Sequence, residues 1–440
     1  MSKRWVAFSL AMLLVLVVWA PMSVAQSQAP EDLFDCCAGL DAKVAAFESS
    51  ISGHNISFQS YGQVNRALLL WDDGLHSKWS FVDNTTSSTR LGFVTQTNIS
   101  PGLVTGVRIE GEFIWPASYQ EFDPADVTHS HKMTDADLRQ GYWFISDDHL
   151  GTLSAGHQWS ATGDLTIINL GSQMNDAAPH FNNGFSLGLA LGPGIFSDLK
   201  WGQIVDTVDT LRANFVRYDI PLLYGFLLSA SVGQGEPDTA EKDSWDIALR
   251  YQKDGPDFRF AGGIGYKDDF EGFLKELKGS ASLLHHPTGL YISLAGGARQ
   301  DAFSSLIGHP VAHFEYVQSG LIWKWLPYGN TTAYGDFGFY KNYNVGALLN
   351  VDPGTGQLVT WGTLAETEVV RWGLGAEQSF DKSGLLVYVQ SHNYQPAIIG
   401  FPCGSNPSQY ANHCGGNPDN LVTLPMKPWD GIVAGARLRF

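Results

Sequence analysis

The last eleven residues of the chain, Asp430 to Phe440, read DGIVAGARLRF and end on an aromatic side chain. Successive side chains of a β-strand point to opposite faces, so this stretch has one apolar and one mixed face. The apolar face carries Ile432, Ala434, Ala436, Leu438 and Phe440, and the other carries Val433, Gly435, Arg437 and Arg439. The first face suits lipid and the second suits water. Such a final strand needs a partner, and pairing it with the first strand would close a barrel.

The N-terminus has the pattern of a secretory signal peptide. Lys3 and Arg4 precede an apolar run from Trp5 to Ala20, and small residues follow at Ser23-Val24-Ala25. A membrane anchor is the alternative, but the run is shorter than the roughly 20 residues that a spanning helix needs. We therefore expect residues 1–25 to be removed by cleavage after Ala25.

Composition narrows the class of protein. The formal net charge of -17 argues against nucleic acid as a partner. No later stretch approaches the ~18 apolar residues of a spanning helix, so a mature chain that crosses a membrane must do so as a closed barrel. A secreted soluble β protein is the alternative. The 48 glycines, 25 Phe, 16 Tyr and 14 Trp fit a barrel with aromatic girdles.

Residues 26–55 differ from the rest of the chain. Within Glu31 to Ile51 the apolar residues follow a heptad spacing: Leu33, Cys37, Leu40, Val44, Phe47 and Ile51. This predicts a short periplasmic helical segment, either a loose helix or plug segment or a short oligomeric coiled coil. The adjacent Cys36 and Cys37 cannot readily bridge to each other, but a coiled coil would bring them close to copies in neighbouring subunits.

Residues 56–440 show strand patterns throughout, which predicts an all-β, transmembrane antiparallel β-barrel. We expect sixteen strands near 57–72, 88–99, 103–115, 139–149, 152–159, 211–221, 225–234, 243–254, 258–268, 274–286, 290–301, 313–327, 332–344, 366–380, 385–395 and 430–440. An even number returns both termini to the same rim. A barrel of this width holds an aqueous channel, and the polar second face of its strands predicts a wet lumen.

The connections alternate in length, as in an outer-membrane barrel with short periplasmic turns and longer external loops. Turn-forming residues mark tight links near 100–102, 150–151, 254–256, 288–289, 329–330 and 381–384. Long connections are expected near 116–138, 160–210, 345–365 and 396–429.

Several motifs resemble the general bacterial porins, especially those of alphaproteobacteria. They are YGQVNRALLLWDDG at Tyr61 to Gly74, RLGF at Arg90 to Phe93, VRYDIPLLYGF at Val216 to Phe226, SWDIALRY at Ser244 to Tyr251 and VAGARLRF at Val433 to Phe440. The resemblance implies a homotrimer in the outer membrane, in contact with lipid and lipopolysaccharide. Each barrel would be a passive, water-filled channel for ions and small hydrophilic solutes.

The resemblance also implies that the third external loop folds into the barrel and sets acidic side chains against a basic wall. That loop is Ser160 to Thr210, and its charged residues are Asp164, Asp176, Asp198, Asp206, Asp209 and Lys200. Four net negative charges near a narrow lumen predict a mild preference for cations.

For the wall, the motifs indicate Arg90 and Arg217, and strand alternation adds Arg108, Glu110 and Glu112. The phase of the alternation is lost near Arg66. Some family members carry an arginine where this chain has His157, so a pore-lining His157 would make the local charge depend on pH. The alternative for each arginine is a purely structural pair with a neighbouring carboxylate.

Other constellations are weak. His129 and His131 have no third ligand in view, and we expect no metal, no cofactor and no catalytic site. Cys403 and Cys414 are candidates for a loop disulfide that would contribute ~2 to 3 kcal/mol in an oxidising exterior. A solute-specific channel or ligand-binding receptor, and less readily a barrel hydrolase, are the rival functions.

Overall fold

The computed structural model describes most of the chain from residue 56 onward. The described residues are 56–114, 135–173, 188–192, 195–207, 212–234, 243–270, 274–301, 311–352, 359–402 and 421–440. The predictions for the signal peptide, for residues 26–55 with Cys36 and Cys37, and for His129, His131, Asp176, Asp209, Cys403 and Cys414 lie outside them.

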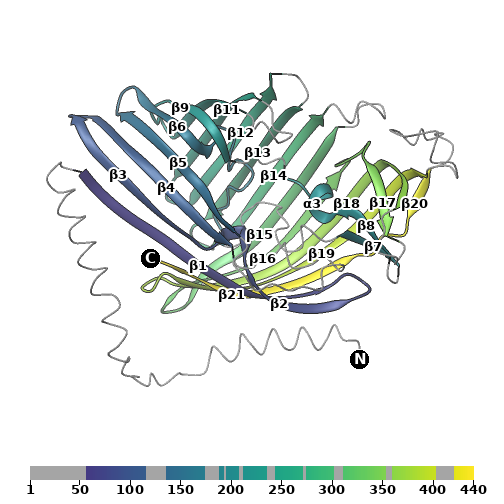
Figure 1. The fold of residues 1–440 in the computed structure, drawn as a ribbon. Helices are drawn as coiled ribbons and strands as arrows, with labels where there is room; N and C mark the ends of the chain where they lie inside the picture. Colours follow the sequence, from purple (N-terminus) through teal and green to yellow (C-terminus); the bar gives the residue numbers. More distant parts are fainter. Residues whose placement is uncertain are drawn as a thin grey trace, which may run out of the picture.

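Sixteen antiparallel strands form a closed barrel, which confirms the predicted fold class (Figure 1). In ring order they are β1 (Ile56–Asp72), β3 (Arg90–Ser100), β4 (Leu103–Ile114), β5 (Asp135–Asp147), β6 (Gly151–Trp159), β9 (Arg212–Asp219), β10 (Phe226–Gln234), β11 (Ser244–Asp254), β12 (Phe258–Asp269), β13 (Leu274–His285), β14 (Leu290–Asp301), β15 (Ala312–Leu326), β16 (Gly329–Lys341), β18 (Val359–Phe380), β19 (Leu385–Pro402) and β21 (Trp429–Arg439). Each predicted strand corresponds to one of them.

The barrel closes where β21 pairs with β1, from Gln63 opposite Arg439 to Asp72 opposite Asp430. Beyond the end of β21, the Gly62 nitrogen donates to the Phe440 carbonyl at 3.0 Å, and the Phe440 nitrogen donates to the Gly62 carbonyl at 3.1 Å. Val433 and Arg437 are buried, whereas the Phe440 side chain is 69% exposed on the opposite face. The two faces predicted from the sequence are therefore the inner and outer faces of the final strand.

The long connections contain more regular structure than the sequence indicated. The predicted long connections hold β7 (Gly188–Gly192), β8 (Ile195–Lys200), α3 (Trp201–Ile204), β17 (Leu348–Asp352) and β20 (Val422–Leu424), and the shorter connection between β1 and β3 holds β2 (Ser77–Asp83) and η1 (Thr85–Ser87). The barrel strands β18 and β19, with 22 and 18 residues, also extend into the predicted connections 345–365 and 396–429. Those two connections are therefore partly strand, because pairing of β17 and β20 with the barrel strands extends the sheet past the rim. Among the described residues, no helix is long and apolar enough to cross a membrane.

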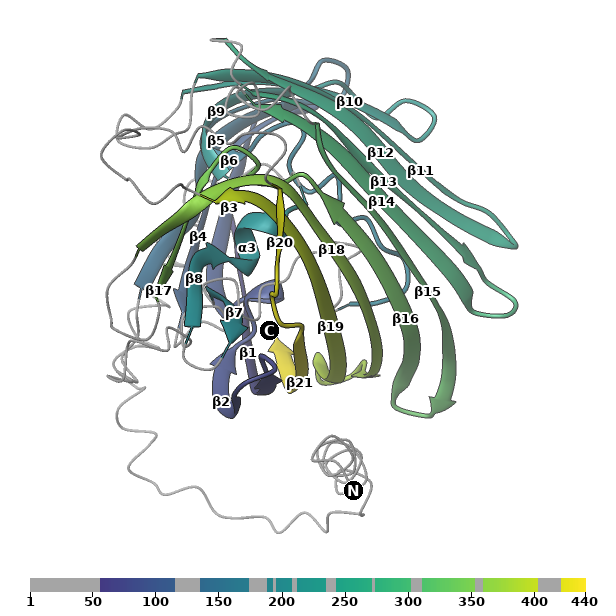
Figure 2. The ribbon, with the colours of Figure 1, turned by 90° about the vertical axis from the view of Figure 1, so that its right-hand side faces the viewer.

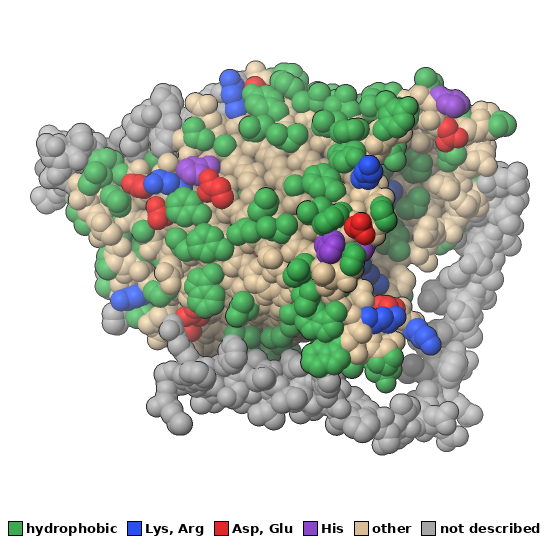
Figure 3. Space-filling view, turned by 180° about the vertical axis from the view of Figure 1, so that it is seen from behind, with side chains coloured by type: hydrophobic (Ala, Val, Ile, Leu, Met, Phe, Trp, Pro, Cys, Tyr) green, Lys and Arg blue, Asp and Glu red, His purple; other side chains and the backbone are tan. Residues whose placement is uncertain are grey.

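The outer surface is apolar in the way a lipid-facing barrel requires. Figure 3 shows hydrophobic side chains spread over one outer face, with the few charged ones mostly toward its margins. Trp143, Ile264, Leu294 and Trp372 are among the exposed side chains of barrel strands. Near the short turns, aromatic pairs such as Trp323–Trp325, with ring centroids 6.2 Å apart, form part of an aromatic girdle.

Candidate functional site

The segment Ser160 to Gln173 leaves β6 and crosses the inside of the barrel. The Ala161 nitrogen donates to Ser231 Oγ of β10 at 2.9 Å, and the Thr162 nitrogen donates to Asp246 Oδ2 of β11 at 2.8 Å. Farther along, the Leu170 nitrogen donates to Ser282 Oγ of β13 at 3.0 Å. These side chains accept hydrogen bonds from backbone N–H groups that the irregular fold of the segment leaves unpaired inside the barrel. We call residues 160–173 the crossing segment.

The crossing segment is also anchored at both ends by charged side chains of the wall. At its start, Arg217 of β9 donates to the Ser160 carbonyl at 3.1 Å, and Arg250 of β11 donates to the Gly163 carbonyl at 2.6 Å. At its far end, the Gln173 nitrogen donates to Glu377 Oε2 of β18 at 2.8 Å, and Ser172 donates to the other carboxylate oxygen. Charge-assisted bonds of this kind are stronger than neutral ones, so both ends are held firmly.

Glycines on the inner face of β12 make room for the crossing segment. A Cβ atom at Gly263 would lie 2.6 Å from a methyl carbon of Leu165, and one at Gly265 would lie 2.5 Å from the other methyl carbon. A Cβ atom at either position would clash with Leu165, so packing explains why β12 has glycine at these two positions. Leu165 packs there with Ala161 and with Ala248 of β11.

The later part of the same connection fills one side of the lumen. β7, β8 and α3 gather with β17 and β20 at one end of the barrel (Figures 1 and 2). Their apolar side chains join those of β16, β18, β19 and β21 in one hydrophobic cluster, in which Trp201 of α3 lies 5.8 Å from the ring of Tyr394. The expectation of a wet lumen is thus wrong for this side, where burial of large aromatic residues replaces water.

Another part of the lumen wall, on β1, β4 and β5, carries a network of charged residues and Tyr61. Arg139 Nε lies 2.8 Å from Glu110, and Arg139 Nη1 lies 2.8 Å from Glu112. Arg108 Nε donates to the Tyr61 hydroxyl at 2.9 Å, which in turn donates to Glu110 at 2.8 Å. We call Tyr61, Arg108, Glu110, Glu112 and Arg139 the wall network.

Strand alternation puts three members of the wall network on one face of β4. Arg108, Glu110 and Glu112 lie on the inner face of β4, whereas Val107, Ile109 and Phe113 are exposed outward. Arg139 escaped the sequence analysis because the β4–β5 pairing shifts register between Glu110 and Gly111. That irregularity turns the side chain of Arg139 inward, and alternation alone cannot anticipate it.

Three arginines of the lumen make no close ion pair with a described residue. Arg90 lies opposite Gln63 and Glu112 in the strand register and makes no ion pair or hydrogen bond with a described residue. Arg212 lies over the ring of Trp159, with its guanidinium carbon 3.9 Å from the ring centre. Arg250 donates only to the Gly163 carbonyl within the described part of the chain.

The remaining predicted residues occupy different surroundings. Arg217 pairs with Asp219 at 2.8 Å and anchors the crossing segment. Asp164 is part of that segment, next to the carbonyl that Arg250 binds, and has a φ of 59°. Asp198 instead accepts from the Asn350 nitrogen at 2.8 Å and from its side chain at 2.6 Å, which joins β8 to β17. Asp206 pairs with Arg299 at 2.7 Å.

His157 does not point into the lumen, although the sequence analysis considered it as a pore-lining residue. Ser154 and Gln158 are buried on the inner face of β6, where Ser154 donates to Gln158 at 2.9 Å. Strand alternation puts His157 on the opposite face of β6 from both. The sequence motif lies on this strand. It did not show which face the side chain of His157 takes next to Gly156, which has a φ of 134°.

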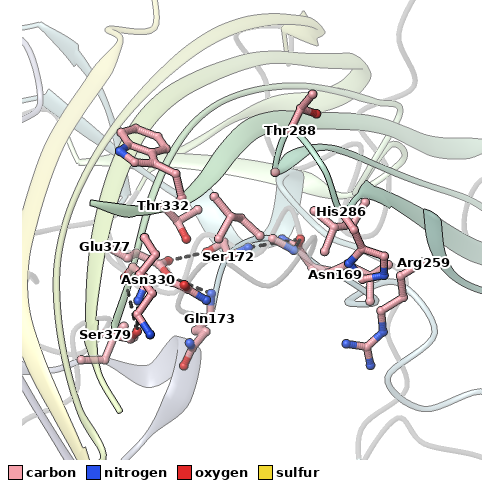
Figure 4. A pocket seen from close by; sticks show the side chains of 18 of the residues that line it. Asn169, Ser172, Gln173, Arg259, His286, Thr288, Asn330, Thr332, Glu377 and Ser379 are labelled. Atoms are coloured by element: carbon pink, nitrogen blue, oxygen red, sulfur yellow. Dashed lines mark hydrogen bonds between the residues drawn. The ribbon is translucent and has the colours of Figure 1, made fainter. Parts of the chain in front are cut away.

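The short-turn side of the crossing segment borders a cavity of about 600 Å³. Figure 4 shows Asn169, Ser172 and Gln173 of the segment between two groups of wall residues, with Asn330, Glu377 and Ser379 on one side and Arg259 and His286 on the other. Among the described residues, no group of three His, Cys, Asp or Glu side chains could hold a metal ion.

Comparisons with known proteins agree with this architecture. A family model described as Gram-negative porin matches residues 11–395. No curated protein matches the chain in sequence. Among solved structures, the anion-selective porin from Comamonas acidovorans is similar at a TM-score of 0.53 and 12% identity, over 88% of this chain and 100% of that chain. The trimer form of OmpT from Vibrio cholerae gives a TM-score of 0.50 at 13% identity, over 88% and 99%. OmpF from Salmonella typhi in complex with daunomycin gives the same four values.

Proposed function

The chain belongs to the Gram-negative porin family and forms a channel in the outer membrane, and we propose that this channel is a passive, water-filled path constricted by the crossing segment. The observation that carries the proposal is the line of hydrogen bonds from β10 to β18 that holds the crossing segment inside the barrel. The hydrophobic cluster occupies one side of the lumen, so solutes would pass along the wall network on the other side. Its charged and hydroxyl groups supply the polar lining that hydrated solutes need.

Bilayer recording tests this proposal directly. The purified protein should insert in discrete steps of conductance, and the current should grow in proportion to salt concentration without saturating for one solute. The absence of steps from protein that is folded in detergent would refute the channel. The family and the fold indicate a channel without enzymatic activity.

The sign of the ion preference depends on which charges reach the path. The expected mild preference for cations rested on the aspartates of the third connection, but Asp198 binds Asn350 and Asp206 pairs with Arg299. Of the described aspartates, Asp164 remains beside the crossing segment. Arg212 and Arg250 lie near it, and Arg90 lies near Glu110 and Glu112, all three without a close ion pair among the described residues, so we propose a weak preference for anions instead. A reversal potential in a salt gradient gives the sign.

We also propose that the chain assembles as a homotrimer, as the trimer form of its structural neighbour OmpT does. The outer face of β2 supports an interface between subunits, because Trp79 and Phe81 are 64% and 65% exposed there. Unheated electrophoresis should show a trimer that Trp79→Glu with Phe81→Glu converts to monomer. A trimer unchanged by that double substitution would move the interface elsewhere.

A further inference from the structure

The cavity on the short-turn side of the crossing segment has the size of a ligand site. Its volume of about 600 Å³ falls within the range of ~300 to 1,000 Å³ typical of small-molecule pockets. Asn169 to Gln173 form one boundary, and the turn between β13 and β14, with the adjoining ends of β15, β16 and β18, forms the other. A solute in this cavity would lie between the constriction and the short-turn rim.

The boundary made by the crossing segment is well fixed. Asn169 donates to Gln318 at 2.7 Å and accepts from Ser293 at 3.1 Å. Arg437 of β21 donates to the Gln173 carbonyl at 3.0 Å, beside the bonds of Ser172 and Gln173 to Glu377. A boundary held in this way is preorganised, so a solute would not need to order it on binding.

The charges around the cavity favour an anion. Lys324 has no acidic partner among the described residues. Arg259 and His286 share Asp254, at 4.0 and 2.8 Å. The carboxylate of Glu377 is already engaged on both oxygens by Ser172 and Gln173 of the crossing segment, so it offers little to a cationic solute. The unmatched charge that remains is the ammonium group of Lys324, and Arg259 also lines the cavity.

Neutral polar groups on the cavity wall suit hydroxyl groups of a solute. The side-chain amide of Asn330 and the hydroxyl of Thr332 make no hydrogen bond with a described residue. Leu284, Ile322 and Leu386 supply apolar surface on the same cavity wall. A polyhydroxylated carbon chain has the matching combination of hydroxyl groups and C–H surface.

We propose that this cavity binds a small hydroxylated organic anion of the sugar-acid type, whose carboxylate contacts Lys324 and Arg259 and whose hydroxyl groups contact Asn330 and Thr332. The inference rests on the proposed channel, because such a solute reaches the cavity only through an open lumen. Charge-assisted hydrogen bonds to the two cations give the carboxylate an advantage over a neutral sugar of the same size. The cavity is open to water, so binding is weak and reversible.

Gluconate and glucose are the probes, because they have the same number of carbons and differ in the carboxylate. In single-channel recordings of the full-length protein, gluconate should interrupt the current when it is added on one side of the bilayer. The same concentration on the other side should interrupt it less, because the crossing segment lies in between. Glucose should have little effect on either side. Equal interruption by the two probes would overturn the assignment to an anion.

Substitution of Lys324 locates the site. Lys324→Ala should weaken the interruption by about five- to tenfold, the effect expected for one charge-assisted contact in a partly wet site. Lys324→Arg should restore most of it. Lys382→Ala removes the same charge from the turn between β18 and β19, which does not line the cavity, and should change nothing.

Two negative results have different meanings. Normal conductance without gluconate interruption, or interruption that persists in Lys324→Ala, overturns the cavity site and leaves the channel intact. Absence of conductance in the unmodified protein overturns the proposed channel itself.

Discussion

The two sides of the lumen are built from the same kind of strand but have opposite interiors. On β16, β18 and β19 the inward positions include Tyr340, Val369 and Tyr394, which are fully buried against α3 and its neighbours. On β1, β3, β4 and β5 the inward positions hold the wall network and Arg90, among which the side chain of Arg108 is 34% exposed, whereas that of Glu110 is buried. The difference shows that alternation decides which face a residue takes, whereas the returning connection decides whether that face stays wet.

The crossing segment is the boundary between these two sides. It meets the glycines of β12 on one side and reaches Glu377 of β18 on the other. Its backbone bonds mostly to wall side chains, so the wall sequence determines its course. Two features therefore fix the width of the path. One is the packing of Leu165 against the glycines of β12, and the other is the set of hydrogen bonds that hold both ends of the crossing segment.

The largest effect on assembly is expected where the barrel closes, between β21 and β1. Deletion of Phe440 removes both backbone bonds to Gly62, worth about 2 kcal/mol, and one residue of the aromatic surface near the rim. Assembled barrel in the outer membrane should fall sharply, measured by heat-modifiable electrophoresis. Phe440→Tyr keeps the bonds and the ring and should assemble normally. Wild-type assembly of the deletion variant would contradict this role of the terminus.

A large effect on stability is expected on the filled side. Trp201→Ala removes a side chain that is 2% exposed within the hydrophobic cluster, which should cost about 3 to 5 kcal/mol if the cluster behaves as a packed core. The unfolding temperature in detergent should fall, whereas Trp372→Ala on the lipid face of β18 should change it little. Equal effects of the two substitutions would mean that the filled side is not a true core.

A smaller effect is expected at the boundary. Glu377→Ala releases Ser172 and Gln173, so the far end of the crossing segment should fluctuate and the open-channel current should become noisier. The matched control is Glu368→Ala, which removes the same charge from the same strand but affects a pair with Lys341 near the loops. Quiet current in Glu377→Ala would show that the remaining anchors suffice.

The sequence predicted the sixteen barrel strands because alternation and turn residues are local signals. It could not reveal the filled side, since Trp201 and Tyr394 are far apart in the chain and meet only through folding. β17 and β20 are short and depend on pairing with barrel strands, which no local pattern encodes. At the site, alternation found Arg108 and Glu112, but the register shift beside Glu110 hid Arg139.

The smallest effect is expected on the open side, where single charges act on the ions in the path. Arg90 makes no close ion pair with a described residue, although Glu110 and Glu112 lie near it, so Arg90→Ala removes a positive charge that these two carboxylates only partly offset. Within the ~8 Å screening length of physiological salt this charge acts on passing ions, so the reversal potential in a salt gradient should shift modestly toward cation preference. Asp198→Asn provides the comparison, because its carboxylate serves Asn350 between β8 and β17, and it should leave the reversal potential nearly unchanged. A shift from Asp198→Asn as large as that from Arg90→Ala would place the ion path along the side that the hydrophobic cluster fills.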